Sequence, residues 1–170
     1  MLVAWAGRYL PLVEAVPAVM QAEAGEVTVA ETGKGRFVQL VRVGRHELRA
    51  DEPATVPGGL DTGPGPYDYL LAGLGACTSM TLRLYAERKE LPLDRVVVRL
   101  RHDKIHPKDC ADCETREGKL DQIERTLEIS GSLDAFTRQR LLGIADKCPV
   151  HRTLTSEVKI RTRLAAPGAE

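Results

Sequence analysis

The sequence predicts an α+β fold in which helices gather on one side of a mainly antiparallel sheet. Several short segments alternate apolar and polar side chains, which is the two-residue period of β-strands, and two longer segments repeat apolar residues every three or four positions, as helices do. These segments follow one another in the order strands, helix, strands, helix, strand. A chain of 170 residues is long enough for one domain with a substantial core. We place this domain at residues 26–164, between an N-terminal extension at 1–25 and a loose tail at 165–170.

Three strands and a long loop are expected first. Residues 26–50 alternate apolar and polar side chains and are interrupted by glycine-containing turns at 33–35 and 44–45, which predicts a three-stranded meander. Residues 51–66 hold four prolines and four glycines, which neither a helix nor a central strand tolerates. We expect this segment to be a long ordered loop or a mobile arm. Loops of this length in compact domains are more often functional than accidental.

The segment from Tyr67 to about Glu90 predicts a long helix. Gly73 and Gly75 each cost roughly 1 kcal/mol relative to alanine inside a helix, so we expect another backbone to pass close to them. Steps of three and four residues bring one set of side chains to a common face, widened by Leu71, Thr78 and Tyr85. We expect this face to be buried, and its members are Leu70, Leu74, Cys77, Thr81 and Leu84.

Two strands and a second helix are expected next. The strands are residues 95–102 and 123–131, and in the second of them Ile123, Leu127 and Ile129 alternate against Arg125 and Glu128. Ser132 or Asp134 can cap the helix that follows. Its apolar side is formed by Phe136, Leu141, Leu142 and Ala145.

Pro149 is expected to end the second helix. Because a residue before proline favours extended geometry, Cys148 should lie on the turn between this helix and the last strand. That strand is predicted at residues 153–164, where Leu154, Val158 and Ile160 alternate with polar side chains.

Composition argues against several classes of protein. The 24 basic and 24 acidic residues balance, and aromatic residues make up only 4% of the chain, which argues against a nucleic-acid binder. The apolar N-terminus is interrupted by Arg8 and Glu14 and by two prolines, so we expect neither a secretory signal nor a membrane span. We therefore expect a cytoplasmic protein. In that reducing compartment, four cysteines indicate reactive thiols or metal ligands before structural disulfides.

One short stretch contains four potential metal ligands, His102, His106, Cys110 and Cys113. Two cysteines and two histidines form a common structural zinc site. Against zinc, only three residues separate the two ligand pairs, whereas known zinc fingers leave a dozen or more. Cys110 and Cys113 could instead form a dithiol that relays reducing equivalents, or the stretch could be a polar hairpin tip. The sequence leaves these three interpretations open.

The other two cysteines stand far apart in the sequence. Cys77 lies on the apolar stripe of the first helix, where a cysteine is by default a small core hydrophobe. Cys148 has charged residues on both sides, and a nearby cation favours the thiolate form of a cysteine. Local spacing does not show whether the two thiols meet.

Two motifs carry a resemblance to a known family. The segment "PYDYLLAGLGACTSMTLRLYAERK", followed later by "LLGIADKCPVHRTL", resembles the OsmC/Ohr family of thiol peroxidases, in a branch with GACT and CPVHRTL signatures. The resemblance covers roughly residues 26–164. It implies an intertwined α+β homodimer, with two long central helices packed between sheets and active sites at the subunit interface.

The resemblance also implies a chemistry. Cys77 matches the family's peroxidatic cysteine and Cys148 its resolving cysteine. The implied activity is reduction of organic hydroperoxides in oxidative or osmotic stress, through a Cys77–Cys148 disulfide that an external dithiol reduces. It implies no metal or organic cofactor.

The chain departs from the family pattern at the residues that activate the thiol. Tyr67 stands where the family has Glu, with Asp68 one position later, and the family's arginine is matched by Lys34, with Arg36 two positions beyond. We expect Asp68 with Lys34 or Arg36 to rebuild this network, and Glu52 could join it if the loop folds over the site. The alternatives are a non-catalytic protein on the same scaffold that binds a small apolar ligand or senses oxidation or metal, and a zinc-stabilised interaction module.

Overall fold

The computed structural model describes residues 24–106 and 118–165. Our predictions for residues 1–23, Cys110 and Cys113 lie outside these ranges. The chain divides into two compact units. The first contains the described residues up to Gly65 together with those from Arg163 onward, and the second spans Pro66–Thr162.

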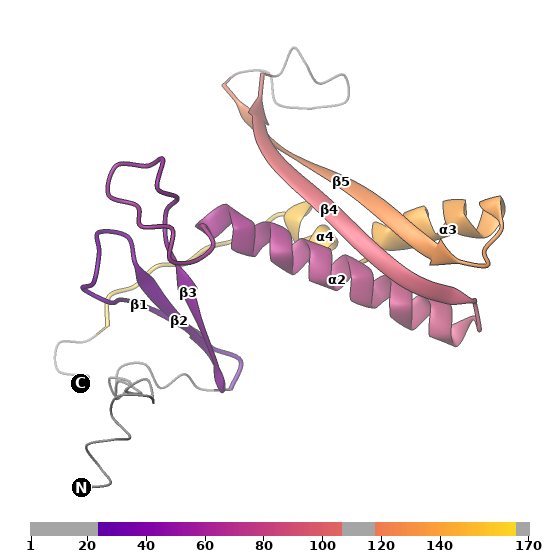
Figure 1. Cartoon of the computed structure of the whole chain (residues 1–170), viewed down its shortest axis with the longest axis horizontal. Coiled ribbons are helices and arrows are strands. Elements are labelled where there is room, and N and C mark those ends of the chain that lie inside the picture. The colour runs from indigo at the N-terminus through magenta and orange to yellow at the C-terminus, as the bar shows by residue number, and fades with distance from the viewer. Residues whose placement is uncertain (1–23, 107–117, 166–170) are drawn as a thin grey trace, which may run out of the picture. The chain divides into compact units, whose positions relative to one another are not determined.

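The first unit contains a three-stranded antiparallel sheet (Figure 1). Its strands are β1 (Val27–Glu31), β2 (Gln39–Val43) and β3 (His46–Ala50), in that spatial order. In the register, Val41 of β2 lies between Val29 of β1 and Leu48 of β3, and Val41 is buried. The predicted meander, with breaks at residues 33–35 and 44–45, is confirmed.

A buried carboxylate, Asp51, organises the Pro- and Gly-rich loop. One of its oxygens, Oδ1, accepts from the Glu52 backbone N–H at 2.8 Å. The other, Oδ2, accepts from the backbone N–H groups of Leu60 (3.3 Å) and Thr62 (3.1 Å) and from the Thr62 hydroxyl (2.9 Å). Residues 51–65 contain no helix or strand, so the predicted loop is confirmed. The Asp51 side chain thus accepts from three backbone N–H groups of the loop, and backbone bonds such as that from the Asp61 N–H to the Glu52 carbonyl satisfy others.

The same loop requires glycine where backbones meet. A Cβ on Gly59 would lie 2.4 Å from the Pro53 carbonyl oxygen, and one on Gly63 would lie 2.5 Å from the Arg49 carbonyl oxygen. Both distances are too short for a side chain. The glycines therefore let the loop fold back on the end of β3.

In the second unit, three helices pack with a two-stranded antiparallel sheet. Strands β4 (Leu93–Ile105) and β5 (Leu120–Gly131) pair antiparallel, and helix α2 (Pro66–Arg88) lies along them (Figure 1). Helices α3 (Ala135–Ala145) and α4 (Pro149–Leu154) both contact α2. Antiparallel sheets combined with helices confirm the predicted α+β class.

Helix α2 buries only part of the face that we predicted: Leu74 and Thr78 are buried, as expected. Leu70 and Leu84 are exposed and Cys77 is half-buried. The buried stripe lies about one residue further round the helix, because that side faces β4 and α3. Its members are Leu74, Gly75, Thr78, Leu82 and Ala86.

The two glycines of α2 differ in their surroundings. A Cβ on Gly75 would come within 2.9 Å of the Leu100 Cδ1 atom on β4, so glycine permits this close approach, to a side chain and not to the backbone that we expected. Nothing in the described part of the chain lies within 4 Å of a Cβ on Gly73.

The core of the second unit lies where α3 packs on α2. Leu82, Leu141 and Ala145 are fully buried. They are surrounded by half-buried apolar side chains from α2, α3, both strands and the connecting turns, namely Tyr85, Leu91, Val96, Leu127, Ile129, Leu133 and Ile144. Burial of Leu141 and Ala145 confirms part of the predicted apolar side of α3, whereas Phe136 and Leu142 are 75% and 44% exposed, so their predicted burial is wrong.

Of the two predicted caps for α3, the structure selects Asp134. Its carboxylate accepts from the Thr137 backbone N–H at 2.6 Å, which satisfies one of the free donors of the first turn.

The C-terminal part of the described chain corrects two predictions. Pro149 does not lead into a strand but occupies the start of α4, where its missing N–H is tolerated, so Cys148 joins two helices. Residues 157–165 form no strand, although Val158 and Ile160 alternate with polar residues as predicted. They have no strand partner in the described chain, and Ile160 is 88% exposed.

Among the described residues, no helix is both long enough and apolar enough to cross a membrane.

Replacing Asp51 by Asn should loosen the 51–65 loop in a pH-dependent way. Although burial raises the pKa of Asp51, the hydrogen bonds from Thr62, Glu52 and Leu60 together hold it below its ordinary value of 3.8. The charged carboxylate therefore stabilises the fold above about pH 4, and this contribution is lost as the pH falls through the folded-state pKa. We expect faster hydrogen exchange at the Leu60 and Thr62 amides in D51N at pH 7. A difference from wild type that does not shrink at any pH below about 4 would contradict this account.

Two adjacent leucines of α3 test the assigned core. Leu141→Ala should lower the free energy of unfolding by about 2–5 kcal/mol, because it opens a cavity in a fully buried cluster. Leu142→Ala should cost about 1 kcal/mol or less, because this side chain is 44% exposed. Urea titrations followed by circular dichroism would compare them. Similar losses in the two variants would place the core elsewhere.

Candidate functional site

Cys148 occupies the junction between α3 and α4 and is fully buried. Its backbone is extended, with φ −64° and ψ 140°, and it is the N-cap of α4. The Cys148 Sγ atom accepts from the His151 backbone N–H at 3.3 Å. Proline at the next position favours this extended geometry, as the sequence indicated.

The hydroxyl of Thr78 meets the sulfur of Cys148. The Oγ1–Sγ distance is 3.7 Å, and Thr78 is the residue that follows Cys77 on α2. A hydroxyl has one hydrogen and two acceptor positions. The hydrogen of Thr78 is donated to the Leu74 carbonyl at 2.7 Å. Cys148 is therefore the donor to Thr78 in this arrangement.

Cys77 lies beside this contact but is not part of it. Consecutive Cα atoms are about 3.8 Å apart, so Cys77 is at the same level of α2 as the contact between Thr78 and Cys148. Consecutive side chains of a helix point about 100° apart around its axis, so the Cys77 thiol does not point where the Thr78 hydroxyl points.

Arg125 of β5 holds together the two segments that carry the cysteines. Its Nη1 donates to Thr78 Oγ1 at 3.1 Å and to the Ala145 carbonyl at 3.3 Å, and its Nη2 donates to Asp146 Oδ1 at 2.6 Å. Only 14% of the Arg125 side chain is exposed. One guanidinium therefore ties α2, next to Cys77, to the end of α3, just before Cys148.

Arg125 is the site residue that the sequence prediction missed. We expected Ile123, Leu127 and Ile129 to alternate against Arg125, but all four have half-buried side chains on the inward face of β5. Their odd-numbered positions were the available signal, because residues two apart on a strand share a face.

A cavity of about 270 Å³ lies next to this network. Its polar lining includes Arg125 and His151, two residues that also take part in the contacts around Thr78 and Cys148. The remaining lining residues are Leu74, Asp121, Ile123, Leu154 and Thr155. The lining of this cavity thus combines apolar side chains with cationic and anionic groups.

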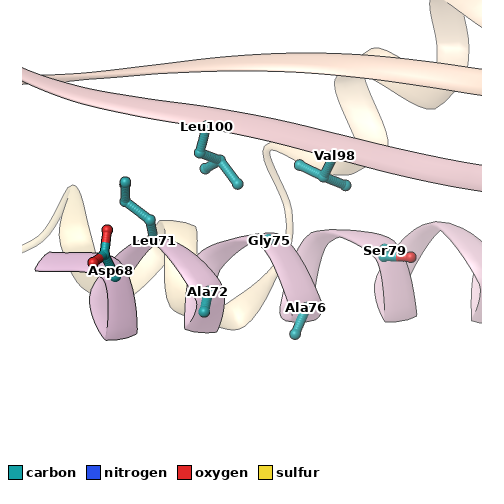
Figure 2. A pocket seen from close by; sticks show the side chains of 8 residues that line it. All are labelled: Asp68, Leu71, Ala72, Gly75, Ala76, Ser79, Val98 and Leu100. Atoms are coloured by element: carbon teal, nitrogen blue, oxygen red, sulfur yellow. The ribbon is translucent and has the colours of Figure 1, made fainter. Parts of the chain in front are cut away.

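A second hollow, of about 460 Å³, lies between α2 and β4. Figure 2 shows Leu71 of α2 and Val98 and Leu100 of β4 pointing into the space between the two elements, with Asp68 at one end. Ala72 and Ala76 point away from the strand (Figure 2). The predicted site residue Asp68 is thus at the rim of an apolar groove. Cys77 lines neither this groove nor the smaller cavity.

His102 lies within β4 and pairs with an acid. Its Nε2 is 2.7 Å from Asp121 Oδ1, and the same oxygen accepts from Lys104 Nζ at 2.9 Å. The hydrogen bond from Lys104, followed by that from His102, holds the pKa of Asp121 below its ordinary value. The ring of Tyr67 stacks on His102 with centroids 4.2 Å apart. These contacts give His102 a structural partner on two sides.

The predicted metal site is only partly within the described residues. His106 is exposed at the end of β4, and Cys110 and Cys113 lie outside. In the parts of the chain that the structure describes, no three His, Cys, Asp or Glu side chains are grouped so that they could hold a metal ion. The zinc, redox-relay and hairpin-tip interpretations therefore stay predictions.

The remaining predicted residues belong to the first unit. The Lys34 backbone N–H donates to the Thr32 hydroxyl at 3.2 Å. The Arg36 guanidinium lies 5.0 Å from the centroid of the Phe37 ring. Glu52 is half-buried, and its carbonyl accepts from the Asp61 N–H in the loop. The expected grouping of these side chains with Asp68 and the cysteines, which lie in the second unit, stays a prediction.

Solved structures of other proteins share this fold. An OsmC-like protein from Mycoplasma pneumoniae is 20% identical, with a TM-score of 0.58, over 76% of this chain and 86% of that chain. An organic hydroperoxide resistance protein from Legionella pneumophila is 18% identical, with a TM-score of 0.55, over 76% and 87%. One from Elizabethkingia anophelis is 19% identical, with a TM-score of 0.56, over 75% and 84%.

At these identities the likeness establishes the fold alone. No curated protein matches the sequence. The model of one protein family, described as OsmC-like protein, matches residues 59–163. This range contains Cys77, Cys148, Thr78 and Arg125 and spans more than half of the chain, which therefore belongs to the OsmC-like family.

Proposed function

We propose that the protein is a cysteine-based peroxidase that reduces organic hydroperoxides in a stress response. The observation that supports it most is the contact of buried Cys148 with Thr78, the residue next to half-buried Cys77, because this contact joins the two segments that carry the cysteines. Family membership adds support, as do the names of the Legionella and Elizabethkingia proteins, which are organic hydroperoxide resistance proteins.

The proposed reaction proceeds in two thiol steps. The Cys77 thiolate attacks the outer peroxide oxygen, the O–O bond breaks, and the alkoxide takes up a proton and leaves as an alcohol. Cys77 is now a sulfenic acid. The Cys148 sulfur attacks the Cys77 sulfur, water leaves, and a disulfide forms. An external dithiol then reduces this disulfide and is itself oxidised to a disulfide, so the cycle needs no metal or organic cofactor.

Burial supports this division of roles between the thiols. Cys77 is half-buried, so a peroxide can reach it, whereas Cys148 is fully buried and donates its hydrogen to Thr78. The first attack requires an accessible thiolate, and the second requires only that a thiol wait nearby. In this proposal, Asp68 with Lys34 or Arg36 supplies the activating charges.

We also propose that the active form is a cytoplasmic homodimer. Val158 and Ile160 are 56% and 88% exposed, in an extended segment without a strand partner in the described chain. On α2, Met80 and Leu84 are 70% and 48% exposed. A second copy of the chain would cover such surfaces and could pair with the backbone of this segment.

One observation favours a non-catalytic alternative. Tyr67 stands where the resemblance implies a glutamate, and its ring is stacked on His102. A protein without that carboxylate could bind a small apolar ligand or sense oxidation with the same two thiols. The peroxidase proposal predicts turnover, whereas this alternative predicts none above that of free thiol.

The two cysteines should fail in different ways. Cys77→Ser should reduce peroxide turnover to the rate of the dithiol alone, because the nucleophile is gone. Cys148→Ser should still consume one equivalent of hydroperoxide but turn over about tenfold more slowly or worse, because the external thiol must then resolve the sulfenic acid. Steady-state and single-turnover assays with an organic hydroperoxide would measure this.

The double variant Cys110→Ser, Cys113→Ser is the matched comparison, because it removes two thiols outside the proposed pair. Full turnover with a small dithiol is expected. Loss of turnover in this variant but not in C77S would move the chemistry to the 102–113 stretch.

The exposed C-terminal segment should matter for dimer formation. Ile160→Asp should shift the protein toward monomer, since burying an isoleucine stabilises an interface by roughly 1.5–3 kcal/mol and a buried carboxylate opposes it. The control is Arg161→Asp, which changes the net charge by two units, whereas Ile160→Asp changes it by one. Arg161 is on the other face of the segment, so the R161D protein should dimerise as wild type does. Sedimentation velocity over a range of concentrations would compare them. A monomeric wild type, or an unchanged I160D dimer, would contradict the proposed interface.

A further inference from the structure

We propose that Arg125 is a positioning residue that holds Cys148 against helix α2 for the disulfide-forming step. This role rests on the proposed peroxidase function. It concerns a residue of β5 whose hydrogen bonds reach Thr78, Ala145 and Asp146, and not the two cysteines themselves. Its effect is exerted through Thr78 and through the end of α3.

The geometry places Arg125 between the two cysteine-bearing segments. Its Nη1 bonds Thr78 on one side and the Ala145 carbonyl on the other, while Nη2 bonds the Asp146 carboxylate. Asp146 is two residues before Cys148. Because a guanidinium is planar and its N–H groups have a fixed fork geometry, these bonds restrain the end of α3 against α2 within the frame set by the apolar core.

Burial makes these bonds hard to replace. The Arg125 side chain is 14% exposed, and three of its contacts reach three different residues. Methionine has a similar length and no donor, so it would leave the Thr78 hydroxyl with one partner fewer and Asp146 without its ion pair. Lysine keeps the charge but is a point donor without the fork, so it should restore the geometry only in part.

Spacing matters for only one step of the proposed chemistry. Formation of the Cys77 sulfenic acid uses one protein sulfur and the peroxide. Condensation joins the Cys77 and Cys148 sulfurs and releases water, and it requires the Cα atoms of the pair to come to about 4.4–6.8 Å. If the Cys148 junction drifts away from α2, the second step slows and the first does not.

The experiment compares R125M and R125K with a matched control, R99M. Arg99 is also a strand arginine, but its Nε makes an exposed ion pair with Glu128 at 2.6 Å and it has no part in this network. Sulfenic acid is trapped with a dimedone reagent after one equivalent of an organic hydroperoxide, and the disulfide is followed by mass spectrometry. A second readout needs no peroxide: the rate at which N-ethylmaleimide alkylates Cys148 in the reduced protein.

R125M should form the disulfide at least about tenfold more slowly than wild type, with Cys77 oxidation within about twofold. Trapped sulfenic acid should therefore accumulate. The rate of disulfide formation in R125K should lie between those of R125M and wild type, and the rate in R99M should equal that of wild type. Alkylation of Cys148 should be faster in R125M than in D134A, a variant that destabilises α3 at its distant cap and so controls for general loss of stability.

Unchanged or faster disulfide formation in R125M would overturn the proposal, as would an equal slowing of both steps. If wild type forms neither sulfenic acid nor disulfide, the peroxidase function fails. The alkylation result then decides the positioning role on its own: faster labelling of Cys148 in R125M supports it, and labelling equal to wild type excludes it.

Discussion

The packing of α3 on α2 fixes where Cys148 lies. Leu82 of α2 and Leu141 and Ala145 of α3 form the fully buried centre of the second unit. The backbone N–H of Cys148 donates to the Ala145 carbonyl at 3.3 Å, so Cys148 lies less than one helical turn beyond that core. Any shift of α3 along α2 would therefore displace the sulfur from Thr78. The apolar core and the candidate site are in this sense one structure.

Polar contacts then select the orientation within that frame. Thr78 has a single hydrogen, already donated to the Leu74 carbonyl, so its remaining acceptor positions serve Arg125 and the Cys148 thiol. In the proposed chemistry this suits a resolving thiol, which stays covered until Cys77 has been oxidised.

Local sequence rules predicted where helices and strands occur better than they predicted which elements pack against one another. The meander, the loop and the long helix follow from turn residues and from periods of two and three to four. Periodicity shows which residues share a face but not which face another element covers, so Leu70 and Leu84 were wrongly expected to be buried. Alternation at Val158 and Ile160 is typical of a strand, but a strand also needs a partner. Pro149 was expected to end a helix and instead begins one.

The candidate site was predictable to a similar extent. Cys77 and Cys148 stood out through their motifs, whereas the contact between Thr78 and Arg125, which are 47 positions apart, forms only when the chain folds back. The two-residue period of β5 could have placed Arg125 on the inner face. Local sequence patterns do not predict which residues its guanidinium contacts. The roles of Lys34, Arg36 and Asp68 depend on how two units come together, which local patterns do not encode.

The most direct test of the central claim is to map disulfides after reduced protein reacts with one equivalent of an organic hydroperoxide. Proteolysis without reduction, followed by mass spectrometry, would identify the linked peptides. The account predicts a rapid, stoichiometric bond between Cys77 and Cys148. A bond between Cys110 and Cys113, with Cys77 still a free thiol, would contradict it.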